Sequence, residues 1–585
     1  MDHWSREFPP HSLRDYALLA DGERGVVVGP RGEFAWMCFP GWSDPALFAT
    51  LIGGNGVYAI TPVGDRFVWG GYYEDGTLIW RSRWVTTSSR VECREALARP
   101  GRTDVAMLLR DVVGIHGTTR VRVVLDPRAE YGAEELRELN CVDGVWTGRT
   151  GSLHVRVTGL GEAIVDHGSL VTEVDVPAGA RRAFVLEVAE RPLAGRPPQA
   201  EVAWRATEDA WHADVPSGRL GVWADRDVRH ALAVLQGMTS SRGGMVAAVT
   251  TSLPERADSG RNYDYRYVWV RDLAMIGQAV AALGPRRLLE QAVGFLVARL
   301  HEDGPGLRPA YAVGGGPVPE ESTLELSGYP GGIDRIGNRA TRQFQLDVFG
   351  EALLLLAAAE RHGCLDDEGW AAVRLAVSAI EQRAGEPDAG IWEIEPRHWA
   401  HSRLIGAAGL RAAAKVAPAA EAGRWATMAD ALVAEVNNDC LHPSLRWQRA
   451  PSDPRVDASL LLPVIRGAVP SGDPRAVATV DGVLDELSED HFLYRFRQGP
   501  GRLSDTEGAF LLCGFHAAIA LAQRGDHVEA ARWFERTRSA CGPSGLFTEE
   551  FDVVQRQLRG NLPQAFVHGA LIEASAVMAE LNGGA

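Results

Sequence analysis

The chain has 585 residues, of which 46% are hydrophobic and 23% are charged, and its formal net charge is −16. This length exceeds what one hydrophobic core usually supports, so we expect a globular protein of at least two domains. The negative charge argues against nucleic acid or an anionic membrane as a partner, because both are bound through basic faces.

Residues 1–200 show the pattern of antiparallel β structure. Short β-branched and aromatic runs alternate with Gly, Pro and Asp turns, as at 26–28, 56–60, 77–80, 121–125 and 183–188. Such spacing is typical of a sandwich of antiparallel sheets. We therefore predict an N-terminal β-sandwich over residues 1–200, which ends in a Pro- and Gly-rich stretch, followed by a helical linker over 201–224.

Residues 225–585 consist of Ala- and Leu-rich segments with helical periodicity, separated by Gly- and Pro-rich loops. Twelve consecutive helices fit six helical hairpins closed into an (α/α)6 barrel. A stacked solenoid is the alternative, but no repeat of fixed period is apparent. The predicted fold class is therefore multidomain, with a β-sandwich followed by an all-α barrel whose loops form a site at one end. The candidate helices lie near 226–239, 271–283, 286–301, 339–362, 368–385, 400–417, 421–438, 457–467, 474–488, 507–524, 526–539 and 564–582.

The seven cysteines are scattered and odd in number, which is typical of reduced thiols and not of a disulfide framework or a zinc site. The chain does not begin with a basic region followed by an apolar run, and no apolar run approaches about 18 residues. We therefore expect a cytoplasmic protein with no membrane partner. Lys415 is the only lysine, and with the abundant Ala and Gly this suggests a bacterial genome of high GC content. The sequence leaves the oligomeric state open, a homo-oligomer included.

Two short stretches place carboxylates next to aromatic side chains. Residues 390–395 read Gly-Ile-Trp-Glu-Ile-Glu, and residues 545–552 read Gly-Leu-Phe-Thr-Glu-Glu-Phe-Asp. In a glycosidase, two carboxylates face each other across a pocket, one to protonate the leaving oxygen and one to deprotonate water. Either stretch alone is more often a solvated surface segment, because exposed carboxylates are the norm.

Residues 261–272 read Arg-Asn-Tyr-Asp-Tyr-Arg-Tyr-Val-Trp-Val-Arg-Asp and precede a predicted helix. A strand with alternating core aromatics and surface ion pairs would give a similar pattern. The density of both residue types favours a sugar-binding edge. Arg and Asp side chains chelate vicinal hydroxyls, and an aromatic ring packs on the apolar face of a sugar.

This stretch resembles the N-W-D-Y-R-Y-x-W-x-R-D motif of glycoside hydrolase family 15, the glucoamylase and trehalase family, in its bacterial form. Residues 335–351 resemble its R-I-G-N-x-A-x-x-Q-x-Q-x-D-x-x-G-E segment, and residues 390–393 resemble G-I-W-E. Residues 494–496 and 507–510 resemble Y-R-Y and E-G-A-F. Residues 545–552 and 560–566 resemble G-L-x-x-E-E-x-D and G-N-F-P-Q-A-F. The motifs occur in the family's order and are specific when taken together.

The resemblance implies an inverting, exo-acting hydrolase that releases β-glucose from the non-reducing end of a short α-glucoside. Trehalose, a malto- or isomalto-oligosaccharide and a glucosylated metabolite all remain open as this small-molecule substrate. By position, Glu393 would be the general acid, Glu549 the general base, and Tyr265 the contact of the attacking water. No metal and no organic cofactor is implied. The implied substrate-binding residues are Arg271, Asp272, Trp269, Trp392, Arg335, Arg495 and Glu550.

Two other function classes remain as alternatives. A glucosyl transferase or phosphorylase on the same barrel would replace the water-activating base, whereas Glu549 is retained. A catalytically silent sugar-binding paralogue would lose Glu393, Glu549 or Tyr265, and none is lost. Tyr263 and His516 stand where the family usually has Trp, so we expect the leaving-group side to differ while the non-reducing glucose site is kept.

Overall fold

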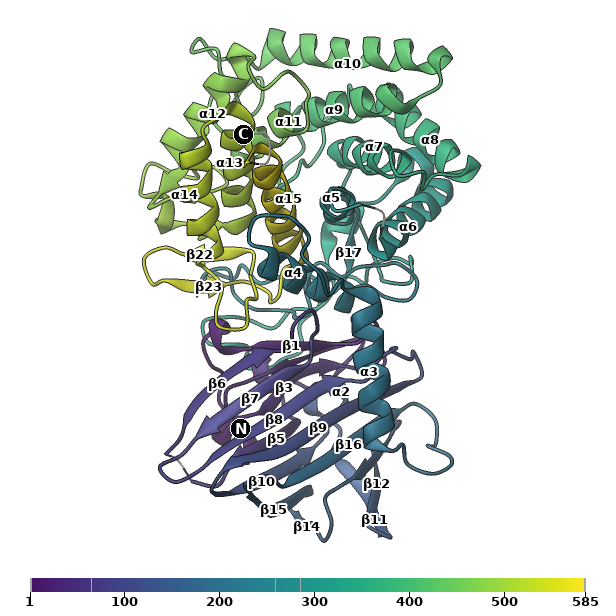
Figure 1. Ribbon diagram of the computed structural model, residues 1–585. Coiled ribbons are helices and arrows are strands. Elements are labelled where there is room, and N and C mark those ends of the chain that lie inside the picture. Colours follow the sequence, from purple (N-terminus) through teal and green to yellow (C-terminus); the bar gives the residue numbers. More distant parts are fainter. Residues whose placement is uncertain (1–2, 65, 258, 285, 583–585) are drawn as a thin grey trace.

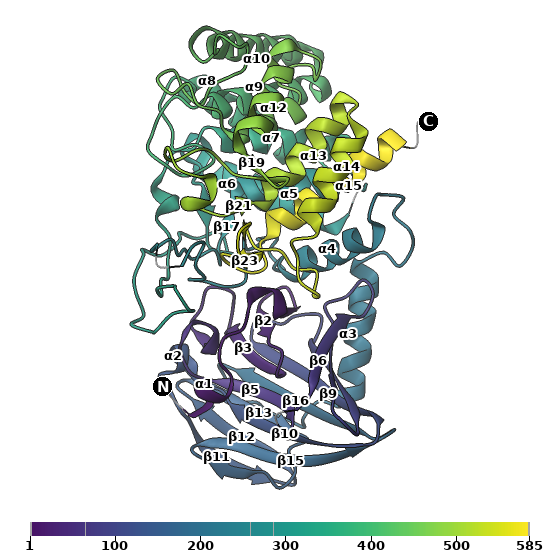
Figure 2. The same cartoon turned by 90° about the vertical axis from the view of Figure 1, so that its left-hand side faces the viewer.

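The computed structural model describes residues 3–64, 66–257, 259–284 and 286–582. The N-terminal part forms two stacked β-sheets, and the C-terminal part forms a ring of helices on top of them in the view of Figure 1. A quarter turn shows the same two bodies, with the first strands of the chain at the end of the sandwich that faces the helices (Figure 2).

Within the described residues, the sandwich consists of two eight-stranded sheets in which all paired strands are antiparallel. The predicted sandwich is therefore confirmed. The first sheet has the order β1 (Ala17–Ala20), β2 (Gly25–Val28), β3 (Glu33–Cys38), β5 (Val57–Pro62), β10 (Thr118–Asp126), β15 (Ser169–Pro177) and β14 (Ile164–Asp166), with β4 (Ala46–Phe48) paired to β3. The second has the order β11 (Leu136–Val142), β12 (Val145–Thr150), β13 (Leu153–Thr158), β16 (Arg181–Ala189), β9 (Val105–His116), β8 (Arg90–Leu97), β7 (Trp80–Val85) and β6 (Val68–Tyr73).

Alternation along the strands explains the packing of the sandwich. In β10, Val121, Val123 and Leu125 are fully buried in the core between the sheets. Val124 points to the other face of the sheet, where it packs with Trp4 of α1 (His3–Glu7) and with Phe8. Burial on both faces is the reason that the alternation of β10 ends in the short apolar run Val123, Val124 and Leu125.

The helix α3 (Ala200–Asp214) runs along one side of the sandwich and leads to the barrel (Figure 1). Its buried Trp204 and Trp211 lie under the guanidinium groups of Arg94 and Arg99, at 4.2 and 4.0 Å from the ring centroids. The helix ends at Asp214, and the sequence that follows contains Pro and Gly, which do not continue a helix. The domain boundaries at residues 200 and 224 stay predictions.

The helical part is an (α/α)6 barrel, as predicted. Among the described residues, six inner helices contact one another in sequence, and the last contacts the first, so that the ring is closed. The inner helices are α5 (Val270–Ala281), α7 (Asp347–Glu360), α9 (Ala400–Val416), α11 (Leu461–Ile465), α13 (Leu511–Arg524) and α15 (Ala565–Asn582). The outer helices are α4 (Asp225–Gly237), α6 (Arg287–Asp303), α8 (Asp367–Arg383), α10 (Ala419–Asp439), α12 (Pro474–Leu487) and α14 (His527–Arg538).

The inner helices are apolar on nearly all sides. In α7 every residue from Asp347 to Ala359 is buried, as expected of a helix enclosed by neighbours. The α7–α9 crossing needs glycine, because a Cβ added at Gly409 would lie 2.4 Å from the carbonyl oxygen of Gly350. This close approach allows two inner helices to pack backbone to backbone.

Three of the predicted helices start later than expected. The segment predicted from residue 457 begins with a single 3-10 turn (Ala458–Leu460), and α11 starts only at Leu461. The segment predicted from residue 339 begins with a single 3-10 turn (Arg339–Arg342), and α7 starts only at Asp347. The segment predicted from residue 507 includes the short strand β21 (Ala509–Phe510), which pairs with β22. The remaining short elements are α2 (Ala129–Gly132), β17 (Val268–Trp269), β18 (Ala310–Tyr311), β19 (Ser488–Glu489), β20 (Phe492–Leu493), β22 (Glu550–Asp552) and β23 (Gln557–Arg559).

A search of the described helices finds none whose length and apolar character would let it cross a membrane.

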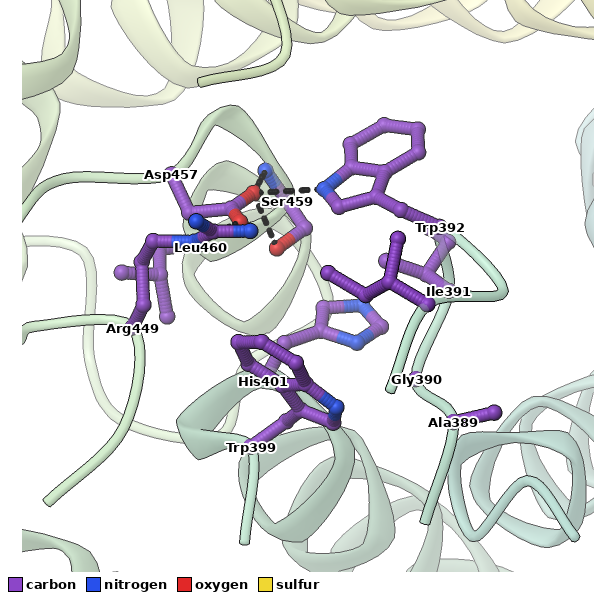
Figure 3. A pocket seen from close by; sticks show the side chains of 11 residues that line it. Ala389, Gly390, Ile391, Trp392, Trp399, His401, Arg449, Asp457, Ser459 and Leu460 are labelled. Atoms are coloured by element: carbon purple, nitrogen blue, oxygen red, sulfur yellow. Dashed lines mark hydrogen bonds and ion pairs between the residues drawn. The ribbon is translucent and has the colours of Figure 1, made fainter. Parts of the chain in front are cut away.

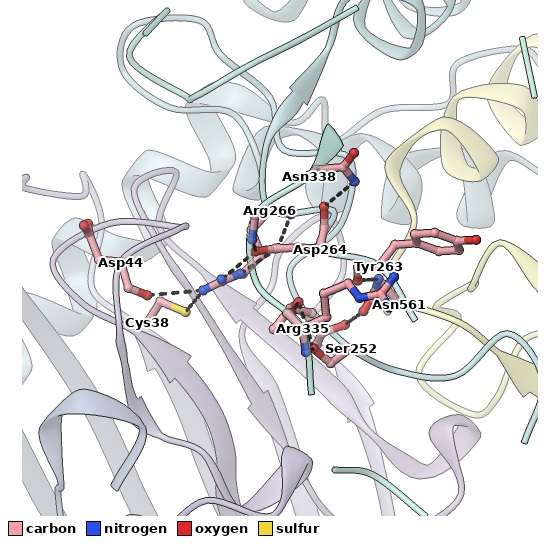
Figure 4. Close-up of polar contacts among 12 residues, drawn as sticks. Cys38, Asp44, Ser252, Tyr263, Asp264, Arg266, Arg335, Asn338 and Asn561 are labelled. Carbon is pink, nitrogen blue, oxygen red and sulfur yellow. Dashed lines mark hydrogen bonds and ion pairs between the residues drawn. The ribbon is translucent and has the colours of Figure 1, made fainter. Parts of the chain in front are cut away.

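A buried ion pair joins the barrel to the sandwich. Arg266 is fully buried and binds both carboxylate oxygens of Asp264, at 2.9 and 2.7 Å (Figure 4). Its Nη1 also donates to Cys38 Sγ and to the Asp44 carbonyl of the sandwich, both at 3.2 Å. Asp264 in turn accepts from the backbone N–H of Gly337 at 3.0 Å. The sandwich therefore holds the segment that precedes α5.

We expect Arg266→Met to unfold at much lower urea concentration than the wild type. Without the guanidinium, the carboxylate of Asp264 is left buried and unpaired, which typically costs about 3–5 kcal/mol. Arg120→Met is the matched control, because Arg120 forms an exposed pair with Asp175 that should contribute nothing measurable. Equal urea midpoints for the two variants would contradict a stabilising role for the Arg266 pair.

Candidate active site

A cavity lies at the end of the barrel nearer the sandwich, where the N-termini of α5, α13 and α15 converge. We refer to it as the barrel-end cavity. Its mixture of aromatic and charged side chains is typical of a small-ligand site. It is lined by Ala247, Tyr265, Trp269, Arg271, Asp272, Met275, Ile391, Trp392, Glu393, Arg495, Leu512, Glu549, Gln564 and Phe566.

The extended segment before α5 divides its side chains between two faces. Tyr265 and Trp269 line the cavity, and their rings meet edge to face at 5.3 Å. Asp264 and Arg266 point to the opposite side, into the contact with the sandwich (Figure 4). This is the period of two expected of extended backbone. The ring of Tyr263 stacks on Tyr265 at 5.9 Å and continues the aromatic face.

Glu393 is held at one of its two carboxylate oxygens. Oε1 accepts from Trp269 Nε1 at 2.6 Å, from Arg271 Nη2 at 3.3 Å and from Gln345 Nε2 at 3.4 Å. The backbone of Glu393 has a φ of 58°, in the left-handed region that a residue with a side chain rarely adopts. Such strain persists only where the surroundings fix the conformation, and it is frequent at functional sites.

The turn that carries Glu393 depends on Gly390. This residue has a φ of 66°, and a Cβ added to it would lie 2.8 Å from Cδ1 of Trp399. Trp392 is fixed from behind, because its Nε1 donates to Asp457 Oδ1 at 2.7 Å (Figure 3). Asp457 also accepts from Arg449 Nε at 2.9 Å. The ring of Trp392 and the carboxylate of Glu393 are therefore held by different partners.

Arg271 and Asp272 occupy the first turn of α5. The Arg271 guanidinium donates to Gln345 Oε1 at 2.6 Å and lies 3.4 Å from the Asp347 carboxylate. Burial raises the pKa of Asp272 to about 7, with Glu393 adding to the rise and Arg271 opposing it. Asp272 is therefore poised to hold a proton near neutral pH and to act as donor or acceptor toward a hydroxyl.

Glu549 also lines the cavity and comes immediately before β22. Its side chain is largely buried, and its Oε2 has no hydrogen-bond partner among the residues that the structure describes. Burial raises the pKa of Glu549 well above its usual value, and the charge of Glu255 adds to the rise while Arg495 opposes it. Arg495 packs against the ring of Phe510 at 4.1 Å and is paired with Glu507 at 2.5 Å.

Eight of the predicted residues line the barrel-end cavity: Glu393, Glu549, Tyr265, Arg271, Asp272, Trp269, Trp392 and Arg495. The structure does not place Arg335 or Glu550 in its lining. The backbone N–H of Arg335 donates to Ser252 Oγ at 2.7 Å (Figure 4), and the fully buried Glu550 accepts from the N–H of Gly508 at 2.7 Å. Both act on the scaffold around the site.

Sequence reasoning missed several residues that contact the predicted ones. Gln345 bonds both Arg271 and Glu393, Asp457 holds Trp392, and Gln564 and Phe566 line the cavity. Gln345 lies in the family motif at 335–351, and Gln564 and Phe566 lie in the one at 560–566. These motif positions could have identified them as site residues. Asp457 and Glu255 lie outside every motif. Within the described part of the chain, no group of three His, Cys, Asp or Glu side chains is arranged to hold a metal ion.

Comparison with known proteins gives the family. The profile of glycosyl hydrolases family 15 matches residues 228–576, and a trehalase-like N-terminal profile matches residues 3–189. The chain belongs to glycosyl hydrolases family 15. Among curated relatives, the trehalase of Mycobacterium tuberculosis is 30% identical, over 97% of this chain and 89% of its own length. The trehalase of Thermoplasma acidophilum is 26% identical, over 95% of this chain and 98% of its own length.

The architecture agrees with this assignment. A crystal structure of a bacterial glucoamylase complexed with acarbose has a TM-score of 0.71 to this structure at 13% sequence identity. The alignment covers 98% of this chain and 95% of that one, so the sandwich and the barrel are both shared. As a member of family 15, the protein is a glycoside hydrolase.

Proposed function

We propose that this glycoside hydrolase cleaves a short α-glucoside with inversion, with Glu393 as the general acid and Glu549 as the general base. The observation that carries the proposal is that these two carboxyl groups line one cavity, together with Tyr265, Arg271 and Asp272. Inversion requires room for a water between acid and base, which corresponds to roughly 6.5–9.5 Å between their carboxyl groups.

The hydrogen bonds at Glu393 suit a proton donor. Its three partners at Oε1, from Trp269, Arg271 and Gln345, are all N–H donors. A proton on Oε1 would point at these hydrogens, so the proton of the acid belongs on Oε2. The three donors thereby select the oxygen that protonates the leaving group.

Glu549 suits the opposite task. When ionised, its unpartnered oxygen has free lone pairs and can take a proton from a water bound between it and the sugar. A neighbouring carboxylate and low solvent exposure both make Glu549 a stronger base than an exposed glutamate. The hydroxyl of Tyr265, which also lines the cavity, would hold this water from a second direction.

We propose trehalose as the substrate. The curated relatives from Mycobacterium tuberculosis and Thermoplasma acidophilum, which match nearly the whole chain, are named trehalases. Trehalose consists of two glucose units joined through their anomeric carbons. Arg271, Asp272 and Arg495 would hold one unit by directional hydrogen bonds, and Trp392 and Phe566 would pack against the sugar faces.

Glucose release from trehalose, maltose, isomaltose and longer glucans tests this assignment. We expect kcat/KM to be highest for trehalose, because the named relatives share the architecture over nearly their whole length. A higher kcat/KM for maltose or isomaltose would move the substrate assignment to that linkage. If none of these sugars released glucose, trehalose hydrolysis would be wrong. A glucosylated metabolite as substrate, or a sugar-binding role, would then be favoured.

The raised pKa of Glu549 gives a pH prediction. The base acts only when ionised, so kcat/KM should fall as pH falls through the pKa of Glu549. Because burial and Glu255 raise this pKa, the acidic limb should lie well above about 4.3, the usual value for a glutamate. A pH series of kcat/KM, with circular dichroism at each pH to verify folding, measures the limb. A limb at the ordinary glutamate value would contradict the described environment of Glu549.

A further inference from the structure

A third carboxylate, Glu255, lies behind the wall of the barrel-end cavity. Its side chain is buried, with 4% of its surface exposed, and it is not among the residues that line the cavity. Its Oε1 accepts from the hydroxyl of Tyr265 at 3.4 Å, and its Oε2 accepts from Arg261 Nε at 3.0 Å. Glu255 therefore contacts the tyrosine of the wall without reaching the substrate space.

Glu255 also lies close to Glu549. Both side chains pack around Gly560, where an added Cβ would lie 3.7 Å from Glu255 Cγ and 4.0 Å from Glu549 Cβ. Among the charged groups around Glu549, Glu255 contributes most to the raised pKa of Glu549. The carboxylate thus touches one proposed partner of the attacking water and lies beside the other.

We propose that Glu255 is a positioning residue for hydrolysis, which orients the hydroxyl of Tyr265 and places a carboxylate beside Glu549. This inference rests on the proposed function of the cavity and deepens it. An ionised carboxylate only accepts hydrogen bonds, so the phenol proton of Tyr265 points to Glu255 and away from the cavity.

The consequence concerns the water. With its proton directed at Glu255, the phenol oxygen offers only lone pairs to the cavity. The attacking water must then donate one hydrogen to Tyr265 and the other to Glu549. In the reaction the second proton passes to Glu549, the water oxygen bonds to the anomeric carbon, and the glycosidic bond breaks. The leaving oxygen takes its proton from Glu393.

Arg261 forms an ion pair with Glu255 within this crowded region. The guanidinium contacts Glu255 at 3.0 Å, Glu507 at 3.4 Å and Glu550 at 4.0 Å, so it is shared among three buried carboxylates. These contacts leave the charge of Glu255 only partly neutralised, and it acts on Glu549 across Gly560. The charged or titratable groups around Glu549 include Glu255, Tyr263, Tyr265, Asp272, Glu393, Arg495 and Cys513, with Glu550 next in the chain.

The test compares Glu255→Gln and Glu255→Asp with the wild type by two readouts. Infrared difference spectra between each protein and its Glu549→Gln counterpart, recorded across pH without substrate, report the protonation of Glu549. The pH dependence of kcat/KM on trehalose reports the same group during turnover. Glu187→Gln is the control, because Glu187 is likewise buried and paired with an arginine, Arg156 at 2.7 Å, in the distant sandwich.

We expect Glu255→Gln to lower the midpoint pH of the infrared titration of Glu549 by about one unit, since a like charge is removed. The acidic limb of the kcat/KM profile should move by the same amount. Glu255→Asp keeps the charge, so its midpoint should stay near the wild type. Its shorter side chain loses the bond to Tyr265, so kcat should fall about ten- to 100-fold. The control should change neither readout.

An unchanged or raised midpoint in folded Glu255→Gln would overturn the effect on Glu549. An unchanged kcat in Glu255→Asp would overturn the positioning of Tyr265, even if the Gln variant failed to fold. If the wild type released no glucose from trehalose, the proposed substrate would fail. The infrared titration would still decide whether Glu255 controls Glu549, so the two failures are distinguishable.

Discussion

Glu549→Gln is expected to lose trehalose hydrolysis while keeping glucose binding. The amide cannot take a proton from water, and the loss of a general base typically lowers kcat by about 10²–10⁴-fold. Glutamine has the same shape as glutamate, and the residues proposed to hold the glucose, Arg271, Asp272 and Arg495, are untouched. Initial rates on trehalose and calorimetric titration with glucose measure the two properties separately.

Asp552→Asn is the matched control for this variant. Asp552 lies three residues further on, at the end of β22, is partly exposed and does not line the barrel-end cavity. It should retain wild-type kcat. Turnover by Glu549→Gln at a rate similar to the control would show that another group activates the water.

Glu393→Gln is expected to show a loss that depends on the leaving group. An amide at this position can still accept from Trp269 and Arg271 but has no acidic proton to give. For trehalose, whose leaving group is a sugar hydroxyl, kcat/KM should fall about 10²–10⁴-fold. For an aryl α-glucoside with a nitro-substituted phenol, the loss should be far smaller, because such a phenol departs without a proton.

Glu395→Gln is the control within the same turn. Its side chain is exposed and pairs with Arg397 at 2.8 Å, so both substrates should keep their wild-type kcat/KM. Equal losses for the sugar and the aryl substrate in Glu393→Gln would contradict the role of general acid. They would instead indicate that Glu393 only binds the non-reducing unit.

The sequence was sufficient to predict both architectures, because local periodicity differs between them. Burial on alternate residues marks β10, and burial on all sides marks α7 and α13. The first residues of the helices were predicted less accurately. Gln343 and Gln345 lie in the non-helical stretch before α7, where their side chains form hydrogen bonds with Glu393. The local sequence pattern does not predict that contact.

Residues of the site were predictable only where they fall in contiguous motifs. Tyr265, Arg271 and Glu393 were found in this way, and all line the cavity. Glu255 was missed because its chemistry arises from neighbours brought together by folding, including Glu549, which lies 294 positions along the chain (549 minus 255). The positive φ of Glu393 is likewise a property of the packed turn and not of its sequence.

The role of the sandwich also lay beyond the sequence pattern. Arg266 was assigned to a sugar-binding edge by its alternation with aromatic residues, whereas its side chain faces away from the cavity to Cys38 and Asp44. The alternation itself was the correct signal, because it places Tyr265 and Arg266 on opposite faces. The alternation does not say which of the two faces lines the cavity. That follows only from the structure, in which the face of Arg266 is covered by the sandwich.

The most direct test of the account is proton NMR of trehalose hydrolysis, recorded faster than glucose mutarotates. Inversion converts the attacked α-glucosyl unit to β-glucose and releases the other unit as α-glucose. We therefore predict that the α- and β-anomeric signals appear in equal amounts at the earliest times. Release of α-glucose alone would mean retention, and it would contradict a mechanism in which Glu549 directs water at the anomeric carbon.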